Sequence, residues 1–310
     1  MLSRMAECLY WMARNMERAE NTARLLDVSL QMSLLHAGSQ DDLLVPLDVT
    51  GTTGDFLQRQ AVPRASDVLH YLALDGETPG SIFNCIRRAR ENAHVVRVKM
   101  STEMWEQING TWLEAREWQQ SGLDTHTAST FLDWVKQRSH LFRGISYGTM
   151  LRNDTFQFSR LGTFIERADN TARILNVKTK QIRDGEPQAE NILDYYQWAA
   201  LLRSVSAFEA FRDTYRDSIT PERVAELLIL RPDMPRSLRA CLDEIDQVLS
   251  HIEGQAGRAA RRLASEIQAR LTYSSIEDIF SQGLEQSLDG LIEDITRLGQ
   301  VIHHSYLEVV

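Results

Sequence analysis

One stretch of this chain occurs twice, and this internal match constrains the fold more than any other feature of the sequence. Residues 9–28 align without gaps on residues 158–177 at an offset of 149, and nine of the twenty aligned pairs are identical. Residues 71–86 align on residues 227–242 at an offset of 156. Two matches in the same order and at nearly the same offset indicate a tandem duplication with its boundary near residue 150.

Both copies are expected to be helical. Apolar residues recur with the helical period in nearly every long segment, and almost no segment alternates apolar and polar residues as a strand does. The chain has 310 residues, of which 43% are apolar and 25% charged, so it can bury a substantial core. We therefore predict an all-α fold, a pseudo-symmetric helical bundle built by tandem duplication of one helical unit, with residues 1–150 and 151–310 packed as one domain.

The ends of the helices follow from the apolar period and from capping residues. Asp154 is expected to cap one helix, Thr220 precedes a proline at the first position of another, and Ser274 opens a capping-box pattern. Residues 37–56 and 121–127 are the least helical stretches, and each is expected to be a surface loop or a mobile lid. The expected helices are 2–36, 64–74, 81–100, 102–120, 127–151, 154–183, 188–217, 221–230, 235–252, 256–270 and 283–308.

The first repeated segment is expected to form a helix with charged residues beside an apolar stripe. The small residues Ala6 and Ala13 would let a neighbouring helix approach Glu17. Glu20 lies four residues before Arg24, a favourable spacing for an ion pair. The apolar stripe consists of Leu2, Met5, Leu9, Met12, Met16, Ala19, Ala23 and Leu26. The flank beside it holds Ala6, Tyr10, Ala13, Glu17, Asn21 and Arg24.

The second copy repeats these charged residues, with Gly162 in the position of Ala13. If the two helices pack about a pseudo-twofold axis, Glu17 is expected to meet Arg167 or Arg173 of the other copy, and the reverse. The repeated residues are Glu166, Arg167, Asp169, Asn170 and Arg173.

These charged residues have two interpretations. One is a buried salt-bridge network that fixes the register of the helices. The other is a polar pocket in which arginines hold a carboxylate or phosphate group while a carboxylate acts as base. In the pocket interpretation, the candidate catalytic residues are Glu17 and Glu166. The candidate substrate-binding residues are Arg18, Glu20, Asn21, Arg24, Arg167, Asp169, Asn170 and Arg173.

No motif for metal, nucleotide or covalent chemistry stands out. Glu91 and His94 have the Glu-x-x-His spacing of di-iron helical bundles, but such a site needs a second motif. The repeat-equivalent residues, Gln247 and Ser250, cannot supply one. We expect neither a metal nor another cofactor. The sequence also lacks a Gly-rich phosphate loop and a Gly-x-Ser-x-Gly elbow, which argues against ATP use within this chain.

Net charge and cysteine content limit the classes of partner and the cellular compartment that we expect for this protein. The net charge of −9 disfavours nucleic acid as a partner, because such binding relies on concentrated Lys and Arg. The sparse cysteines, Cys8, Cys85 and Cys241, suggest a reducing compartment. The sequence shows neither a signal peptide nor an apolar run long enough to span a membrane, so we expect a cytoplasmic protein with no membrane partner.

The sequence resembles the bacterial alpha-E family over essentially its whole length. The resemblance rests on the segments 3–7, 9–14, 17–26, 81–92, 103–109, 166–175 and 235–242. The motif for which the family is named would be Glu17-Arg18 in the first copy and Glu166-Arg167 in the second. Ala13 departs from the glycine expected at that position.

Membership in that family implies particular partners. Its members are typically encoded, or fused, with a circularly permuted ATP-grasp protein and often lie near a transglutaminase-like protein. ATP-grasp enzymes commonly join a carboxylate to an amine through an acyl phosphate. The resemblance therefore implies a helical partner of a peptide or amide ligase, which binds or shields an amine or an activated acyl substrate. A stand-alone enzyme that forms or hydrolyses amides, and a structural scaffold whose Glu-Arg pairs are salt bridges, are the alternatives.

Overall fold

The structure of the chain, a computed structural model, is helical wherever regular structure occurs in the described residues, which are 2–35, 40–60, 62–124, 126–184, 192–252 and 257–308. This confirms the expected all-α fold. Contacts divide the chain into two compact units, Met1–Thr163 with Val309–Val310 and Phe164–Glu308. Helix α8 (Asp154–Asp184) begins in the first unit and continues into the second. Whether the predicted copies, 1–150 and 151–310, pack as one domain stays a prediction.

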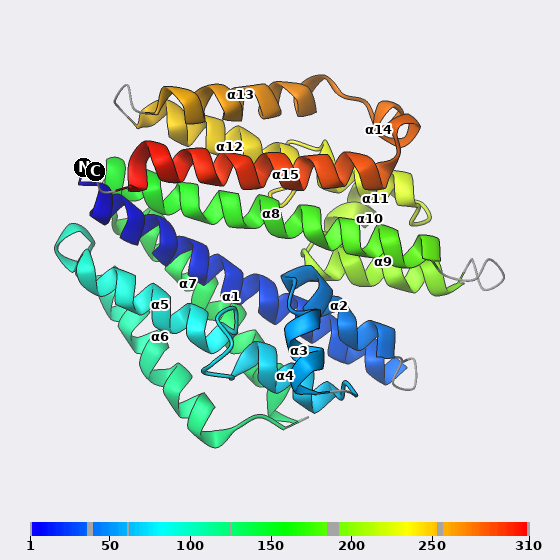
Figure 1. Ribbon diagram of the computed structural model, residues 1–310, viewed down its shortest axis with the longest axis horizontal. Helices are drawn as coiled ribbons and strands as arrows, with labels where there is room; N and C mark the ends of the chain where they lie inside the picture. The colour runs from blue at the N-terminus through cyan, green and yellow to red at the C-terminus, as the bar shows by residue number, and fades with distance from the viewer. Residues whose placement is uncertain are drawn as a thin grey trace. The chain divides into compact units, whose positions relative to one another are not determined.

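The first unit is built around α1 (Figure 1). Its helices are α1 (Ser3–Leu35), α2 (Gln40–Thr50), α3 (Thr53–Arg59), α4 (Ala65–Ala73), α5 (Ile82–Val95), the short η1 (Arg97–Lys99), α6 (Thr102–Ser121) and α7 (Thr127–Thr149), followed by the start of α8. Helix α1 packs against α2, α4, α5 and α7. The predicted apolar stripe is buried along most of this helix, with Leu9 and Met12 fully inaccessible, whereas Leu2 at its start is 73% exposed.

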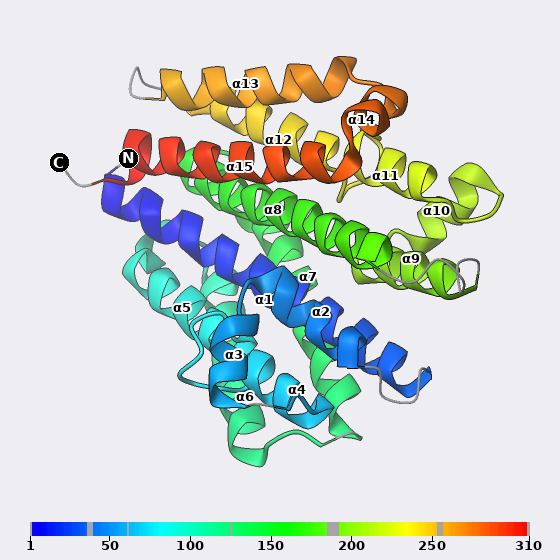
Figure 2. The same cartoon turned by 45° about the vertical axis from the view of Figure 1, so that its right-hand side comes forward.

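The second unit follows a similar plan. Its helices are the rest of α8, then α9 (Ile192–Ser204), α10 (Phe208–Tyr215), α11 (Pro221–Ile229), α12 (Leu238–His251), α13 (Arg258–Tyr273), α14 (Ile276–Gln282), α15 (Leu284–Ile302) and the π-helical turn η2 (His303–Leu307). Helix α13 packs against both α12 and α15, and the three lie side by side in Figures 1 and 2.

One predicted loop was wrong. Residues 40–56, expected to be irregular, contain all of α2 and the start of α3, while 37–39 lie outside the described residues. The leucines Leu43 and Leu47 are four positions apart and both are buried, so packing of this apolar face outweighs the proline at position 46. Gly51 has φ of 69° and follows α2, which is a conformation that glycine adopts at helix ends. The predicted loop at 121–127 is confirmed for Gly122–Asp124, and Thr125 lies outside the described residues.

Two predicted helices were also wrong in part. Residues 81–100 form α5 and the short η1, with a break at Val96, and residues 188–217 do not form a single helix. A break separates α9 from α10, and 188–191 lie outside the described residues. At the break Ser206 has φ of 53°, and the amide of Ala207 donates to the carbonyl of Leu202 at 2.7 Å. Ala207 and Phe211 are fully buried, so the bend allows Phe211 of α10 to reach the core.

The predicted caps were right at one helix and displaced at two. The hydroxyl of Thr220 accepts from the amide of Arg223, as expected. Helix α8 is capped by Asn153, whose Oδ1 accepts from the amide of Thr155, and not by Asp154. The capping box of α14 is formed by Ser275 with Asp278, one residue after the predicted Ser274 with Glu277.

Some helices of the two units bury residues at matching positions, which are offset by 156 in the sequence. Helix α6 buries Met104, Gln107, Ile108, Thr111 and Ala115, and α13 buries Ala260, Leu263, Ala264, Ile267 and Leu271. The buried residues of α4 and α11 correspond in the same way. The caps also repeat, because the hydroxyls of Ser81 and Ser237 accept from Asn84 and Ala240, and donate to the carbonyls of Asp75 and Arg231. This is the pattern that a tandem duplication predicts, and the duplication stays an inference.

Gly162 marks a close approach of α8 to α1 within the first unit. A Cβ atom at this position would lie 2.2 Å from the carbonyl oxygen of Tyr10. That distance is far below van der Waals contact, and the obstacle is backbone, which cannot move aside as a side chain does. The sequence match pairs Gly162 with Ala13, so the glycine of the second segment is required by packing inside the first unit.

We expect Gly162→Ala to destabilise the protein by about 1–3 kcal/mol, because the added methyl group forces the two helices apart. Gly144→Ala in α7 is the matched control, since a Cβ atom there meets no atom within 4 Å. It is expected to raise stability by up to about 1 kcal/mol through helix propensity. Urea unfolding followed by circular dichroism measures both, and equal effects of the two substitutions would contradict the close approach.

Candidate functional site

Two buried carboxylates of α1 share one guanidinium group of α7. Glu17 and Glu20 are 1% and 0% exposed. The Nη1 atom of Arg143 lies 2.9 Å from Oε2 of Glu17 and 2.5 Å from Oε2 of Glu20. The same Nη1 lies 3.0 Å from the hydroxyl of the buried Ser139. These charge-assisted contacts offset part of the cost of removing two carboxylates from water.

A second guanidinium group joins this cluster from α1 itself. Nε and Nη2 of Arg24 contact Oε1 of Glu20 at 2.9 and 2.8 Å, which confirms the predicted spacing of the pair. His140 lies between the two arginines, with Nδ1 2.8 Å from Nη2 of Arg143 and Nε2 3.3 Å from Nη2 of Arg24. We call Glu17, Glu20, Arg24, His140 and Arg143 the carboxylate–guanidinium cluster.

The cluster is closed at its base and open at its edge. The two carboxylates are inaccessible, whereas the side chains of Arg24 and Arg143 are 13% and 23% exposed and His140 is exposed. Solvent and any ligand therefore meet guanidinium and imidazole groups first. The buried carboxylates orient these groups from below, an arrangement suited to binding an anion.

Helix geometry explains how the chain places these groups. Glu17, Glu20 and Arg24 are three and four positions apart, so they lie along one face of α1. On α7, Ser139 and Arg143 are also four apart, and the small serine leaves room for the arginine to reach across. Phe142, next to Arg143, is also buried, so this part of α7 faces the interior of the unit.

Two arginines of the second copy have contacts within the second unit. Nε of Arg173 lies 2.8 Å from Oδ2 of Asp169. Arg167 is 8% exposed, and its Nη1 donates to the carbonyl of Pro235 at 3.5 Å. Glu166 is 5% exposed and Asn170 is half-buried. The residues of α15 that lie 156 positions after Arg143 and His140 are Gly299 and Thr296, so α15 supplies neither a guanidinium group nor an imidazole at these positions.

The sequence predicted part of this site. Glu17, Glu20 and Arg24 come together as expected, with Asn21 buried and Arg18 half-buried on the same helix. The pairing of Glu17 with Arg167 or Arg173 stays a prediction. Sequence reasoning missed Arg143 and His140, because they lie over a hundred residues away on a helix outside the repeated motif.

The other residues singled out in the sequence have ordinary contacts. Glu91 lies 3.9 Å from Arg87, and the ring of His94 lies 5.7 Å from that of Trp105. Among the described residues, no three His, Cys, Asp or Glu side chains are grouped to hold a metal ion. The three cysteines are buried thiols, and burial raises the pKa of Cys8, which disfavours a reactive thiolate.

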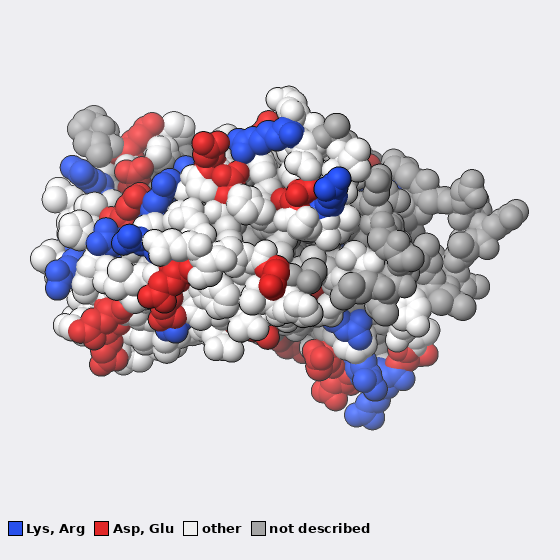
Figure 3. Space-filling view, turned by 90° about the horizontal axis from the view of Figure 1, so that it is seen from below, with Lys and Arg blue, Asp and Glu red and all other residues white. Residues whose placement is uncertain are grey.

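On the face shown in Figure 3, acidic and basic side chains lie in small mixed groups, and the described residues of this face form no large patch of one charge. None of the helices in the described part of the chain is both long and apolar enough to cross a lipid bilayer.

The sequence of this chain is similar to one described family and to three mycobacterial proteins. A family described as a predicted alpha-helical domain with a conserved ER motif matches residues 1–307. Uncharacterized proteins of Mycobacterium bovis and of two strains of Mycobacterium tuberculosis are each 24% identical over 97% of this chain. The chain spans 35% of the length of those relatives. No solved structure matches the chain significantly.

We expect Arg143→Met to destabilise the protein by about 3–5 kcal/mol, because it leaves two buried carboxylates without this partner. Arg138→Met on the same helix is the matched control. Its guanidinium pairs with Glu114 at 2.7 Å, but both side chains are about one-third exposed, at 30% and 38%. Removing such a pair costs about 0.2–1 kcal/mol. Denaturant unfolding measures the difference, and similar losses for both variants would show that the buried pairing contributes little.

Proposed function

The chain belongs to the Alpha-E family, and we propose that it is the helical, substrate-holding partner of an ATP-grasp amide ligase. In this proposal Arg24 and Arg143 bind the carboxylate or acyl phosphate group of the substrate. Glu17 and Glu20 are positioning residues, because their burial keeps them below the guanidinium groups. The observation that carries the proposal is the convergence of guanidinium groups from two helices on one exposed imidazole, that of His140.

The chemistry of the imidazole favours its displacement by an anion. A neutral imidazole has one nitrogen that accepts a hydrogen bond and one that donates. A neutral His140 can therefore accept a hydrogen bond from only one of the two arginines. The shorter contact, 2.8 Å, is between its Nδ1 and Nη2 of Arg143. A carboxylate or phosphoryl group offers acceptor oxygens to both guanidinium groups at once. Since His140 is exposed, its side chain can turn into solvent when such an anion binds.

The proposed partnership with a ligase comes from what the resemblance to the alpha-E family implies. Alpha-E proteins are typically encoded or fused with ATP-grasp proteins, which activate carboxylates as acyl phosphates. In the mycobacterial relatives, the region that corresponds to this chain accounts for 35% of a longer protein, so there it is joined to further sequence. A cluster that binds carboxylate or acyl phosphate anions fits the acyl side of such a reaction. A transglutaminase-like protein is a further partner that the family resemblance implies.

A structural scaffold is the second candidate function. It is favoured by the complete burial of Glu17 and Glu20, which is also what a salt-bridge network that fixes α1 against α7 requires. The two functions make different predictions for the exposed edge of the cluster. A scaffold tolerates changes at His140 and depends on Arg24 for stability alone, whereas a substrate site depends on Arg24 for activity.

The test is ATP-dependent amide formation by the associated ATP-grasp protein with and without this chain. We expect the wild-type chain to accelerate amide formation, and Arg24→Gln to reduce the acceleration by at least about tenfold, which corresponds to one charge-assisted hydrogen bond. Co-purification with the ligase should persist. Arg138→Gln, on α7 outside the cluster, should leave the acceleration unchanged. Equal activity of the two variants, or full activity of the ligase alone, would refute the substrate-holding role.

Direct binding of an anion gives an independent measurement. Acetyl phosphate should raise the Tm of the wild-type chain at constant ionic strength and should have no effect on Arg24→Gln. His140→Ala should bind acetyl phosphate several-fold more tightly, because the anion no longer competes with the imidazole. Weaker binding by His140→Ala would show that the imidazole is itself a ligand and not a displaceable cover.

A further inference from the structure

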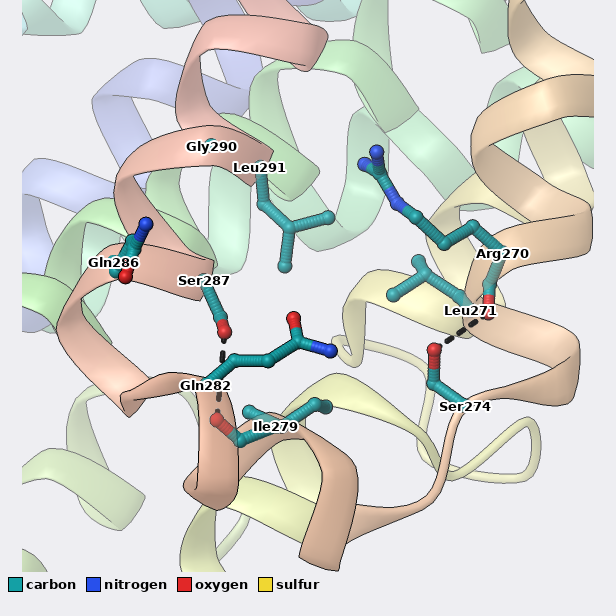
Figure 4. Close-up of a pocket in the computed structure, with 9 residues that line it drawn as sticks. All are labelled: Arg270, Leu271, Ser274, Ile279, Gln282, Gln286, Ser287, Gly290 and Leu291. Atoms are coloured by element: carbon teal, nitrogen blue, oxygen red, sulfur yellow. Dashed lines mark hydrogen bonds between the residues drawn. The ribbon is translucent and has the colours of Figure 1, made fainter.

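The second unit contains an open hollow between α13, α14 and α15, with a volume of about 440 Å³ (Figure 4). Its floor is apolar, because Leu271, Ile279 and Leu291 are buried. Polar side chains stand around it, and in Figure 4 the side chain of Gln282 extends across the hollow towards α13. The lining residues are Arg270, Leu271, Ser274, Ile279, Gln282, Gln286, Ser287, Gly290 and Leu291.

The first unit shows what fills the equivalent space. Helices α6 and α13 bury residues 156 positions apart, and so do α7 and α15, where Ala128, Leu132 and Val135 correspond to Leu284, Leu288 and Leu291. In the first unit three aromatic side chains pack together in this region, with ring centroids 5.5–6.4 Å apart. They are Trp118, Phe131 and Trp134, and the residues at the corresponding positions in the second unit are Ser274, Ser287 and Gly290.

The hollow therefore lies where three rings of the first unit are replaced by small residues. Both serine hydroxyls donate to backbone carbonyls, that of Ser274 to Arg270 at 2.8 Å and that of Ser287 to Ile279 at 3.5 Å. Since each hydroxyl is already satisfied by the backbone, the serines need no buried partner inside the hollow. A ring that enters would cover the apolar floor without leaving these groups unpaired.

An ion pair beside the hollow has a counterpart in the first unit, with the acid and the base on opposite helices. In the first unit Glu114 of α6 pairs with Arg138 of α7. The corresponding residues of the second unit, Arg270 of α13 and Asp294 of α15, also pair. Both units therefore have one acid and one guanidinium group at these two positions. The acid is on α6 in the first unit and on α15 in the second, and the guanidinium group is on α7 in the first unit and on α13 in the second.

In the first unit this ion pair holds an indole ring. Nε1 of Trp134 donates to Glu114 at 2.6 Å, and the guanidinium carbon of Arg138 lies 5.8 Å from the centre of the ring. The acid accepts the indole N–H, while the guanidinium group lies within cation–π distance of the ring. Arg270 and Asp294 supply the same two functions beside a hollow that has no ring of its own.

From this correspondence we propose that the hollow binds an aromatic ring with an N–H or O–H donor, the side chain of a tryptophan or tyrosine of a partner polypeptide. The ring covers Leu271, Ile279 and Leu291, its donor faces Asp294, and Arg270 lies against its face. A side chain is the favoured source because the hollow is open, with Arg270, Gln282 and Gln286 exposed at its rim. A single aromatic anchor that enters an apolar recess with a polar rim is a common centre of protein interfaces.

The test uses N-acetyl-5-fluoro-L-tryptophanamide as the probe, followed by fluorine NMR so that the six native tryptophans do not interfere. We expect saturable binding to the wild-type chain and at least tenfold weaker binding to Gly290→Trp, which fills the hollow with an indole side chain. Ser287→Phe is the second filling variant, in case Gly290→Trp does not fold. Absence of binding to the wild-type chain, or unchanged binding to a folded filling variant, would overturn the proposal.

The first unit supplies a matched control. Trp134→Gly should open a second hollow and add a binding site for the same probe, as Glu114 and Arg138 remain in place. The source of the ring is decided by a comparison with free 5-fluoroindole. Binding of the capped amino acid at least as tight as that of the free indole supports a partner side chain, whereas a tenfold preference for free indole would overturn that assignment in favour of a small molecule.

Discussion

The placement of two carboxylates in the interior of the first unit is the constraint on which the rest of that unit depends. Glu17 and Glu20 lie three positions apart on α1, beside its buried apolar stripe, and are only 1% and 0% exposed. Buried charges of like sign are tolerated when an opposite charge lies between them. Arg143 supplies that charge, so α7 must lie beside α1 at one rotation and one axial register. With α7 in this register, His140 lies beside Arg24 at the exposed edge of the cluster.

The two units use one helical plan for different chemistry. Equivalent positions are buried in α6 and α13 and in α4 and α11, and the serine caps repeat. Other residues of these helices differ between the two units. The first unit has Arg143 and a group of three aromatic rings, whereas the second has Gly299, two serines and Gly290 at the corresponding positions. A shared set of buried apolar positions fixes the backbone of both units, while the residues at several positions beside this set differ between them.

Local features of the fold could be predicted where they depend on neighbours along the chain. The period of α1, the pairing of Glu20 with Arg24 and the cap at Thr220 each involve residues within four positions of one another. Predictions failed where distant packing outweighed local signals. The helix α2 forms despite its proline because Leu43 and Leu47 find a buried surface, and the turn at Ser206 interrupts a helical pattern so that α10 can pack.

The sequence by itself determined the helical class, the central charged helix and its apolar stripe, because periodicity and short-range pairing are properties of a single helix. The tertiary structure alone decided which guanidinium group neutralises Glu17, since Arg143 lies 126 positions away and no pattern in the chain links the two. It also decided where space remains between helices. In the sequence, Gly290 is only a small residue, and it lines a hollow because α13, α14 and α15 meet around it.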